Sequence, residues 1–483
     1  MNPSKTERPA ARYTRASSCI LRETRVSSKT LLRRCSAIVP AITACSQLAY
    51  AQPATSCLIG GYKLANDKVV DIEQADGGDL SWIMFDGESG GLHRQASGQW
   101  DGTYGWTDRK DGKTVNFEPC AKGKINFDGV GGRRIPFDVR NISFESHGTR
   151  LAGRLVMPPG TGKVPVVVLI HGSEDDSAID SYYLQRLLPG EGIGVFVYDK
   201  RGTGRSGGHY TQVFSVLADD AVRAVAEARS LAGNRLGRVG LQGSSEGGWV
   251  APLTAERTPV DFVIVCYGLA VDIIEEDQES AALQMQDAGA SAQDTAKALA
   301  VAGAAENLAA SGFKYGYRTF DALRAKYKRE PWYKHLRGDF TWMLLPDSDA
   351  QLRALAPKLN AWHIPFYYQP MPVLIDDQVP QLWILGGQDF EAPCQETSRR
   401  IKSLISMGKP FTLACYPNAD HQIRLFETKP DGTRVYTRYA PDYFAMMRDY
   451  IISGRLPAAA YGDAAITRPI ASSGSDRSLP TAR

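Results

Sequence analysis

A short motif built around one serine constrains the fold of this chain more than any other feature. Residues 243–247 read Gly-Ser-Ser-Glu-Gly, which has the form G-x-S-x-G. A strand-like stretch at 238–241 precedes the motif, and a run of small and apolar residues at 247–253 follows it. Glycine has no Cβ, so the chain can turn sharply and hold Ser245 in a strained backbone conformation. We therefore expect a strand, a tight turn and a helix whose free N–H groups lie close to Ser245.

The motif alone is weakly specific, because a chain of this length contains about 0.2 such matches by chance. A glycine-rich turn without any chemistry is the alternative. A nucleophilic serine needs a histidine base and an acid that orients the histidine. His421 follows a strand-like stretch at 411–416, and Asp389 ends another that begins at Val379. The order along the chain predicts Ser245 as nucleophile, Asp389 as acid and His421 as base. The weaker rivals for the acid are Asp376, Asp377 and Asp420.

A second loop is expected to complete the site. The apolar stretch 164–170 has the composition of a buried parallel strand and runs into His171-Gly172-Ser173. We predict that the backbone N–H groups of Ser173 and Glu246 bind an oxyanion, with Gly172 as the rival of Ser173. His171 is expected to shape this loop and not to act as the base. The glycine-rich segment 199–207 matches neither phosphate-binding pattern.

Four segments, taken in order, resemble a known family. They read YDKRGTGRSGG, GSSEGGW, LGGQD and NADH. Over roughly residues 140–455 the chain resembles the α/β-hydrolase superfamily, in particular bacterial exported esterases and serine aminopeptidase-like hydrolases. The resemblance implies an α/β fold and matches Ser245, Asp389 and His421 to the nucleophile, acid and base. Ser244 stands where histidine is common, and acidic residues follow His171 where glycine often does, so the substrate preference stays open.

Composition divides the chain into several regions. Residues 1–51 are predicted to be an export signal, 52–135 a small β-rich domain, and 136–456 the α/β-hydrolase domain. Within that last domain, the helix-rich and aromatic segment at about 271–375 is predicted to form a cap over the active site. Residues 457–483 are rich in Ala, Ser, Pro and Gly and are expected to be a disordered tail. The tryptophans of the β-rich domain suggest either a packed core or a surface for a polymer such as a glycan.

The N-terminal segment resembles an export signal with a long basic lead. A charged region at 29–34 precedes a short apolar run at 35–48, and Ala49-Tyr50-Ala51 forms an A-x-A cleavage site. We expect cleavage after Ala51 and a periplasmic or secreted protein. The alternative is a lipoprotein in which Cys45 carries the lipid. The apolar run is too short to span a bilayer, and no membrane span is expected.

Export permits disulfides, so the cysteines that follow Ala51 are informative. Cys57 and Cys120 bracket the β-rich domain and are expected to pair. Cys266 ends a buried strand and is expected to be a free core thiol. That leaves Cys394 and Cys415 as a second pair near the catalytic loops. All-reduced or differently paired cysteines remain the alternative.

These observations favour an enzyme acting on a small-molecule carboxylic ester through an acyl-enzyme on Ser245. The alternative is a peptidase or amidase with the same triad, in which the acidic run 275–279 would recognise a substrate amine. The same run is also typical of an acidic helix N-terminus. A non-catalytic binding protein is a third hypothesis. The net charge of +3 is concentrated in residues 1–34, so nucleic acid is not an expected partner. No cofactor or metal is implied, and the oligomeric state stays open.

Overall fold

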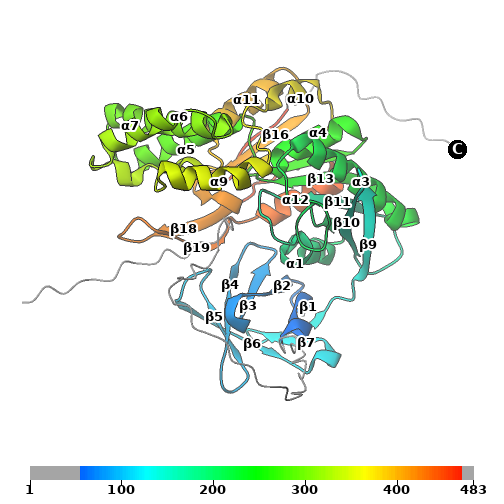
Figure 1. Ribbon diagram of the computed structural model, residues 1–483. Coiled ribbons are helices and arrows are strands. Elements are labelled where there is room, and N and C mark those ends of the chain that lie inside the picture. The colour runs from blue at the N-terminus through cyan, green and yellow to red at the C-terminus, as the bar shows by residue number, and fades with distance from the viewer. Residues whose placement is uncertain (1–54, 470–483) are drawn as a thin grey trace, which may run out of the picture.

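The computed structural model of the protein describes residues 55–469. The expected export signal, with Cys45 and the cleavage site, lies outside the described residues. The chain forms an N-terminal antiparallel barrel, a nine-stranded mixed sheet and a set of inserted helices. Figure 1 shows the barrel below the sheet and the inserted helices to one side above it. This architecture confirms the predicted α/β class with a β-rich N-terminal part.

The barrel contains eight strands, each antiparallel to its neighbours, and β1 pairs with β8 to close it. The hydrophobic side chains of alternate positions point inward and form a core of their own, which includes Trp82, Trp100 and Phe127. Two of the three tryptophans noted in the sequence therefore fill the barrel. The strands are β1 (Gly60–Leu64), β2 (Val69–Gln74), β3 (Leu80–Met84), β4 (Ser89–Arg94), β5 (Trp100–Thr103), β6 (Lys110–Phe117), β7 (Lys124–Phe127) and β8 (Val130–Arg134).

The large sheet has the order β20-β16-β15-β14-β13-β11-β12-β10-β9. The six strands from β16 to β12 run parallel, while the β9–β10 hairpin and β20 are antiparallel edges. The parallel strands are almost continuously buried, as their apolar sequences predict. The bounds are β9 (Asp138–Ser146), β10 (Thr149–Met157), β11 (Val164–Ile170), β12 (Gly194–Tyr198), β13 (Leu236–Ser244), β14 (Phe262–Cys266), β15 (Gln381–Gly386), β16 (Phe411–Tyr416) and β20 (Ala465–Thr467).

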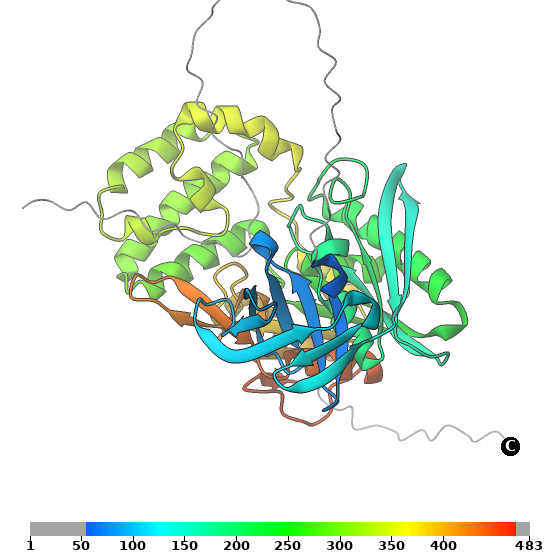
Figure 2. The same cartoon turned by 90° about the horizontal axis from the view of Figure 1, so that it is seen from below.

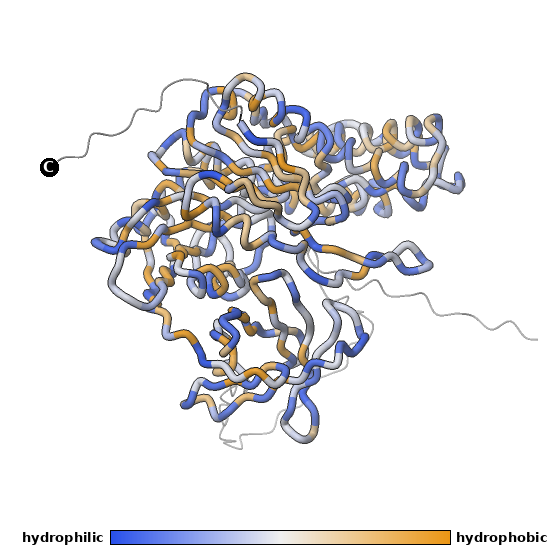
Figure 3. Tube along the Cα trace, turned by 180° about the vertical axis from the view of Figure 1, so that it is seen from behind, coloured by the Kyte–Doolittle hydropathy of each residue, from blue (hydrophilic) through white to orange (hydrophobic). Residues whose placement is uncertain are grey.

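Helices cover both faces of this sheet, and successive residues of a strand enter different cores. On β11, Val166 and Val168 pack into one core, whereas Val167 and Leu169 pack into the other. Figure 3 shows the hydrophobic strands gathered inside the molecule. The first face carries α3 (Phe214–Ala232), α4 (Gly247–Arg257) and α11 (Gln395–Ser406), and the second carries α1 (Ala178–Ser181), α2 (Leu184–Leu187) and α12 (Tyr443–Ser453).

A helical insertion separates β14 from β15 and occupies the region predicted as a cap. Its first helix begins with a capping box in which Asp272 accepts the N–H of Glu275 and Glu275 accepts the N–H of Asp272. In Figure 2 these helices stand beside the sheet, away from the β9–β10 hairpin. They are α5 (Ile273–Asp287), α6 (Ala292–Ala310), α7 (Tyr317–Tyr327), α8 (Thr341–Leu344), α9 (Asp349–Ala361) and α10 (Pro370–Asp376).

The barrel docks against a small sheet that follows β16. This sheet contains β17 (Ala419–Asp420), β18 (Arg424–Thr428) and β19 (Arg434–Tyr439), and it includes the segment around His421. The backbone N–H of Trp106 donates to the Tyr436 carbonyl at 2.9 Å, and the backbone N–H of Tyr439 donates to the Gly87 carbonyl at 3.0 Å. The backbone of the third tryptophan of the β-rich domain therefore serves the contact with the α/β domain.

A buried ion cluster also holds the barrel to α2. Arg186 of α2 donates to both carboxylate oxygens of Asp71, at 2.7 and 2.8 Å, and to Glu73 at 2.6 Å. Asp71 is completely buried. Because an isolated buried carboxylate is costly, Asp71 requires this arginine, and the two domains depend on each other here.

Two expectations about the second half of the chain need correction. Cys57 and Cys120 form the predicted disulfide, and Cys266 is a buried free thiol, but Cys394 and Cys415 are also free. Their sulfur atoms lie 4.0 Å apart, in contact but about twice the length of a disulfide bond.

The C-terminal segment is the second correction. Residues 457–469 do not follow the expectation of a disordered tail, since β20 pairs with β16. Tyr461 is buried and donates its hydroxyl to Asp449 at 2.8 Å, which holds the segment against α12.

Candidate active site

Ser245 occupies a sharp turn between β13 and α4, with a positive φ of 51°. Few residues other than glycine adopt this conformation without strain. Its neighbours must be small: a Cβ on Gly243 would lie 2.1 Å from the Gly247 carbonyl oxygen, and one on Gly247 would lie 2.4 Å from the Ile170 oxygen. The two glycines of G-x-S-x-G therefore let α4 start directly against the strands, with Ser245 on the turn.

Asp389 and His421 meet beyond the carboxyl end of β15. The Nδ1 atom of His421 lies 2.8 Å from Oδ2 of Asp389. The other carboxylate oxygen of Asp389 accepts the N–H groups of Glu391 at 2.9 Å and Ala392 at 2.8 Å. Both oxygens of this buried carboxylate are thus satisfied, and the imidazole is held in the tautomer with its proton on Nδ1 when neutral.

The three rival acids lie elsewhere. Asp376 and Asp377 precede β15, at the opposite end of the strand from Asp389. The Asp377 carboxylate accepts hydrogen bonds from Val379 and Gln381. Asp420 accepts the backbone N–H of His421 at 2.8 Å and the Tyr436 hydroxyl at 3.0 Å, so it supports the loop and not the ring.

The second nitrogen of His421 faces a carboxylate that could not be predicted from the sequence. Nε2 lies 3.6 Å from Glu391, whose side chain is 46% exposed, and the ring packs against Tyr267 with centroids 4.7 Å apart. Burial alone would lower the pKa of His421, but the charges of Asp389 and Glu391 outweigh it and raise this pKa to about 10. Glu391 stands two residues after Asp389, but nothing in the sequence indicates that it turns back toward the base.

The loop His171-Gly172-Ser173 reaches the nucleophile, as expected. A Cβ on Gly172 would lie 3.2 Å from Cβ of Ser245. The Gly172 N–H is already engaged, donating to Glu174 at 3.2 Å and to the Tyr182 hydroxyl at 3.3 Å. Among the hydrogen bonds of residues 55–469, none uses the N–H of Ser173 or Glu246. This difference favours Ser173 over Gly172 as an oxyanion donor.

Two carboxylates of the cap, Glu276 and Asp339, interact electrostatically with Asp389. Burial raises the pKa of Glu276, and the charges of Asp339, Asp277 and Asp389 raise it further. Burial, followed by the charges of Glu391 and Asp277, raises the pKa of Asp339 to about 8, although His421 partly opposes the shift. Other members of the acidic run have structural partners: Glu275 caps α5, and Asp277 accepts the N–H groups of Phe340 and Thr341. Glu276 differs from both neighbours, because Asp389, the predicted acid, is among the charges that raise its pKa.

Within the described residues, no group of three or more His, Cys, Asp or Glu side chains is arranged to hold a metal ion. In the same part of the chain, no helix has the length and hydropathy that a membrane crossing requires.

A mostly parallel sheet, a serine on the turn after β13 and a His–Asp pair after later strands define an α/β-hydrolase, and the protein is a serine hydrolase of this class. Residues 163–429 match the family described as serine aminopeptidase, S33. The chain belongs to this family.

The chain is similar to several solved structures. An esterase from Pyrococcus furiosus is 15% identical, with a TM-score of 0.39 over 59% of this chain and 84% of that one. An acylaminoacyl peptidase from Pyrococcus horikoshii is 14% identical, with a TM-score of 0.37 over 73% of this chain and 52% of that one. A proline iminopeptidase from Mycobacterium smegmatis is 17% identical, with a TM-score of 0.39 over 65% of this chain and 97% of that one. No curated protein matches the chain significantly.

We expect the substitution Ser245→Ala to abolish turnover and labelling by a fluorophosphonate probe, because it removes the attacking oxygen. Loss of a triad nucleophile typically lowers the rate by about 10⁴- to 10⁶-fold. Ser244→Ala is the matched control, since the adjacent hydroxyl is buried and accepts a hydrogen bond from Gln242 at 2.8 Å. Labelling of the Ser245→Ala protein at the wild-type rate would refute the assignment.

The raised pKa of His421 gives a second prediction. The base must be neutral, so kcat/KM should rise with pH up to a pKa near 10. Glu391→Gln removes a negative charge beside Nε2, lowers the pKa of His421 and moves the rise to lower pH. If this pKa falls by about one, the neutral fraction of His421 at pH 7 increases about tenfold. Glu118→Gln on the barrel removes the same charge outside the site and should leave the profile unchanged. A profile that does not move in Glu391→Gln contradicts this role.

Proposed function

We propose that the protein hydrolyses carboxylic esters through an acyl-enzyme formed on Ser245. The observation that carries the proposal is the buried His421–Asp389 pair, 2.8 Å apart, at the same sheet edge as a serine with positive φ. A relic fold used only for binding would have no need of a strained serine and a buried, fully satisfied acid.

In the first half of the reaction, the Ser245 oxygen attacks the ester carbonyl carbon while Nε2 of His421 takes the serine proton. The carbonyl becomes an oxyanion, which the N–H groups of Ser173 and Glu246 bind. Asp389 stabilises the imidazolium. Collapse of the tetrahedral intermediate breaks the bond to the alcohol oxygen, which leaves with the proton from His421. Water then attacks the acyl-enzyme by the same route and releases the acid and free Ser245.

Glu391 must move for this cycle to begin, because its carboxylate faces the nitrogen that receives the proton. Its side chain is partly exposed and can turn outward when substrate enters. An alcohol leaves more readily than an amine, so an ester places a smaller demand on proton delivery by His421. Because the pKa of His421 is raised in the free enzyme, its protonated form is a weak acid and donates its proton less readily. An alcohol needs less proton donation than an amine in order to leave, so an ester suits this site better.

A peptidase acting on a free N-terminal amine is the second candidate, and a specific observation favours it. The carboxylates of Glu276, which is buried, and of Asp339, which is half-buried, interact electrostatically with Asp389. A substrate ammonium group beside them would lower these raised pKa values and favour the ionised carboxylates that bind it. The family name describes aminopeptidases, which agrees with this candidate.

Paired substrates separate the two candidates. We expect higher kcat/KM for p-nitrophenyl esters than for aminoacyl p-nitroanilides, since the ester has the better leaving group. A preference for the anilide that is lost in Glu276→Gln, and kept in Glu275→Gln, would support the peptidase instead. The two variants are matched because Glu275 is adjacent in sequence and its side chain is engaged in the capping box of α5, whose N-cap is Asp272. Fluorophosphonate labelling confirms that each variant retains a reactive Ser245.

We also propose that the protein is exported and that its mature chain begins at Gln52 without lipid. The Ala49-Tyr50-Ala51 site and the disulfide between Cys57 and Cys120 support export, since such bonds persist in oxidising compartments. The intact mass and N-terminal sequence of the exported protein test this. A diacylglyceryl mass on a chain beginning at Cys45 would replace the proposal with membrane anchoring.

A further inference from the structure

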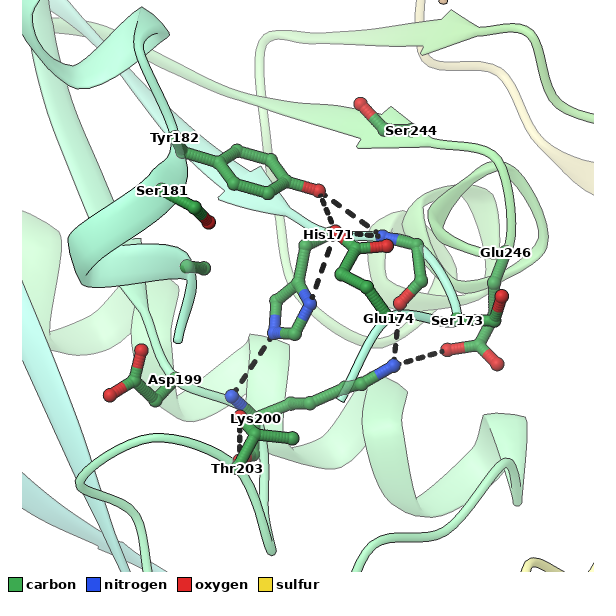
Figure 4. A network of polar contacts seen from close by, with 12 residues as sticks. His171, Ser173, Glu174, Ser181, Tyr182, Asp199, Lys200, Thr203, Ser244 and Glu246 are labelled. Carbon is green, nitrogen blue, oxygen red and sulfur yellow. Dashed lines mark hydrogen bonds and ion pairs between the residues drawn. The ribbon is translucent and has the colours of Figure 1, made fainter. Parts of the chain in front are cut away.

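Lys200 lies beneath the active-site loop with its charge fully enclosed. It follows β12 and the fully buried Asp199, and the Lys200 and Glu246 side chains are each 4% exposed. The ammonium donates to the Gly172 carbonyl oxygen at 2.5 Å and to Oε1 of Glu246 at 3.0 Å. Figure 4 shows it pointing at the loop from His171 to Ser173 and at Glu246. These are the two segments that supply the predicted oxyanion donors.

The first contact acts on a single peptide unit. The Gly172 carbonyl and the Ser173 N–H belong to the same planar amide, and in a trans peptide they point in opposite directions. A hydrogen bond that fixes the Gly172 oxygen therefore also fixes the direction of the Ser173 N–H. A cation on the carbonyl oxygen polarises the amide and makes its N–H a stronger donor.

The second contact reaches the other donor. Glu246 follows Ser245 directly, and its own N–H is the second predicted oxyanion ligand. Its carboxylate accepts a hydrogen bond from the ammonium of Lys200, so the same cation contacts both segments that supply the predicted oxyanion donors. The pair joins positions 46 residues apart in the chain.

Neighbouring groups hold Lys200 itself. Its backbone N–H donates to Nε2 of His171 at 3.1 Å, and its ammonium lies 4.9 Å from the centre of the Tyr210 ring. The Tyr210 hydroxyl donates to the Ser173 carbonyl at 2.5 Å. Both peptide units that flank Ser173 are therefore restrained, one through the Gly172 carbonyl and the other through its own carbonyl.

We propose that Lys200 is a positioning residue for the oxyanion hole, acting on Ser173 through the Gly172 carbonyl and on Glu246 through the ion pair. The proposal rests on the proposed acyl-transfer function. A buried ion pair adds little net stability over apolar residues of similar volume, because desolvation offsets the attraction. Its contribution here is the alignment of two N–H groups that must both face one oxygen in the transition state.

The test removes both charges together, since removing one would leave the other buried and unpaired. The variant Lys200→Met/Glu246→Leu keeps both backbone N–H groups. We expect its kcat on a p-nitrophenyl ester, and its rate of phosphonylation by a fluorophosphonate, to fall about 10- to 100-fold, toward the loss seen when one donor is removed. KM should stay within about threefold, because the oxyanion forms only after binding. Lys200→Arg, which can still donate to both oxygens, should recover part of the loss.

A matched control comes from the next residue. Arg201 is paired with the fully buried Asp220 at 2.7 Å and holds the same segment to α3. Arg201→Met/Asp220→Leu should therefore lower the Tm of the protein but retain kcat. The proposal is overturned if the Lys200 variant retains kcat and phosphonylation within about threefold of the wild-type values. It is equally overturned if the control loses as much, because the effect would then come from a loosened segment.

The two proposals fail in different ways. A wild-type protein that neither reacts with the fluorophosphonate nor hydrolyses any ester overturns the acyl-transfer function and the role of Lys200 with it. A wild-type protein that reacts with the probe but shows no change in the Lys200 variant overturns the role of Lys200 alone. Phosphonylation follows Ser245 directly, so this distinction holds for any natural substrate.

Discussion

The close approach of α4 to the ends of β11 and β13 is the constraint on which the site depends. Gly247 begins the helix within van der Waals distance of the Ile170 carbonyl, a distance that no Cβ would permit. The helix start consequently lies beside the loop that follows β11. Ser245 is left on the turn with a backbone conformation that only surrounding structure can maintain. A larger residue at either glycine would separate the two segments before it affected any catalytic group.

The parallel sheet then brings residues that are distant in the sequence to one edge, without any need for local sequence signals. Ser173, Ser245, Asp389 and His421 all follow the carboxyl ends of strands, and in a parallel sheet those ends lie along one edge. The strand order places β13 between β11 and β14, so the serine turn is flanked by the oxyanion loop on one side. The placement of these four residues along one edge therefore reflects the topology more than any local sequence preference.

This topology explains which parts of the site could be predicted. The serine turn has a local signature, and Asp389 and His421 each follow a recognisable strand, so each residue could be proposed from the sequence. Glu391, Lys200 and Tyr267 could not, because their roles arise from side-chain directions after the loops have packed. The predicted pair of Cys394 and Cys415 shows the same limit: the topology brings them into contact, but proximity alone does not form the bond. The order of segment 457–469 could not be predicted either, because composition carries no information about a free sheet edge, which β16 offers to β20.

The docking of the barrel on β18 and β19 has a consequence for the order of folding. The barrel leaves the ribosome first, yet Arg109 pairs with Glu427, which is made 318 residues later. Until then, Trp106 has no carbonyl to receive its N–H, and Asp71 has no partner until Arg186 appears. The strands next to His421 likewise lack their outer support until the barrel docks. The support of the segment around His421 thus depends on contacts between residues far apart in the chain, which a partly synthesised chain cannot make.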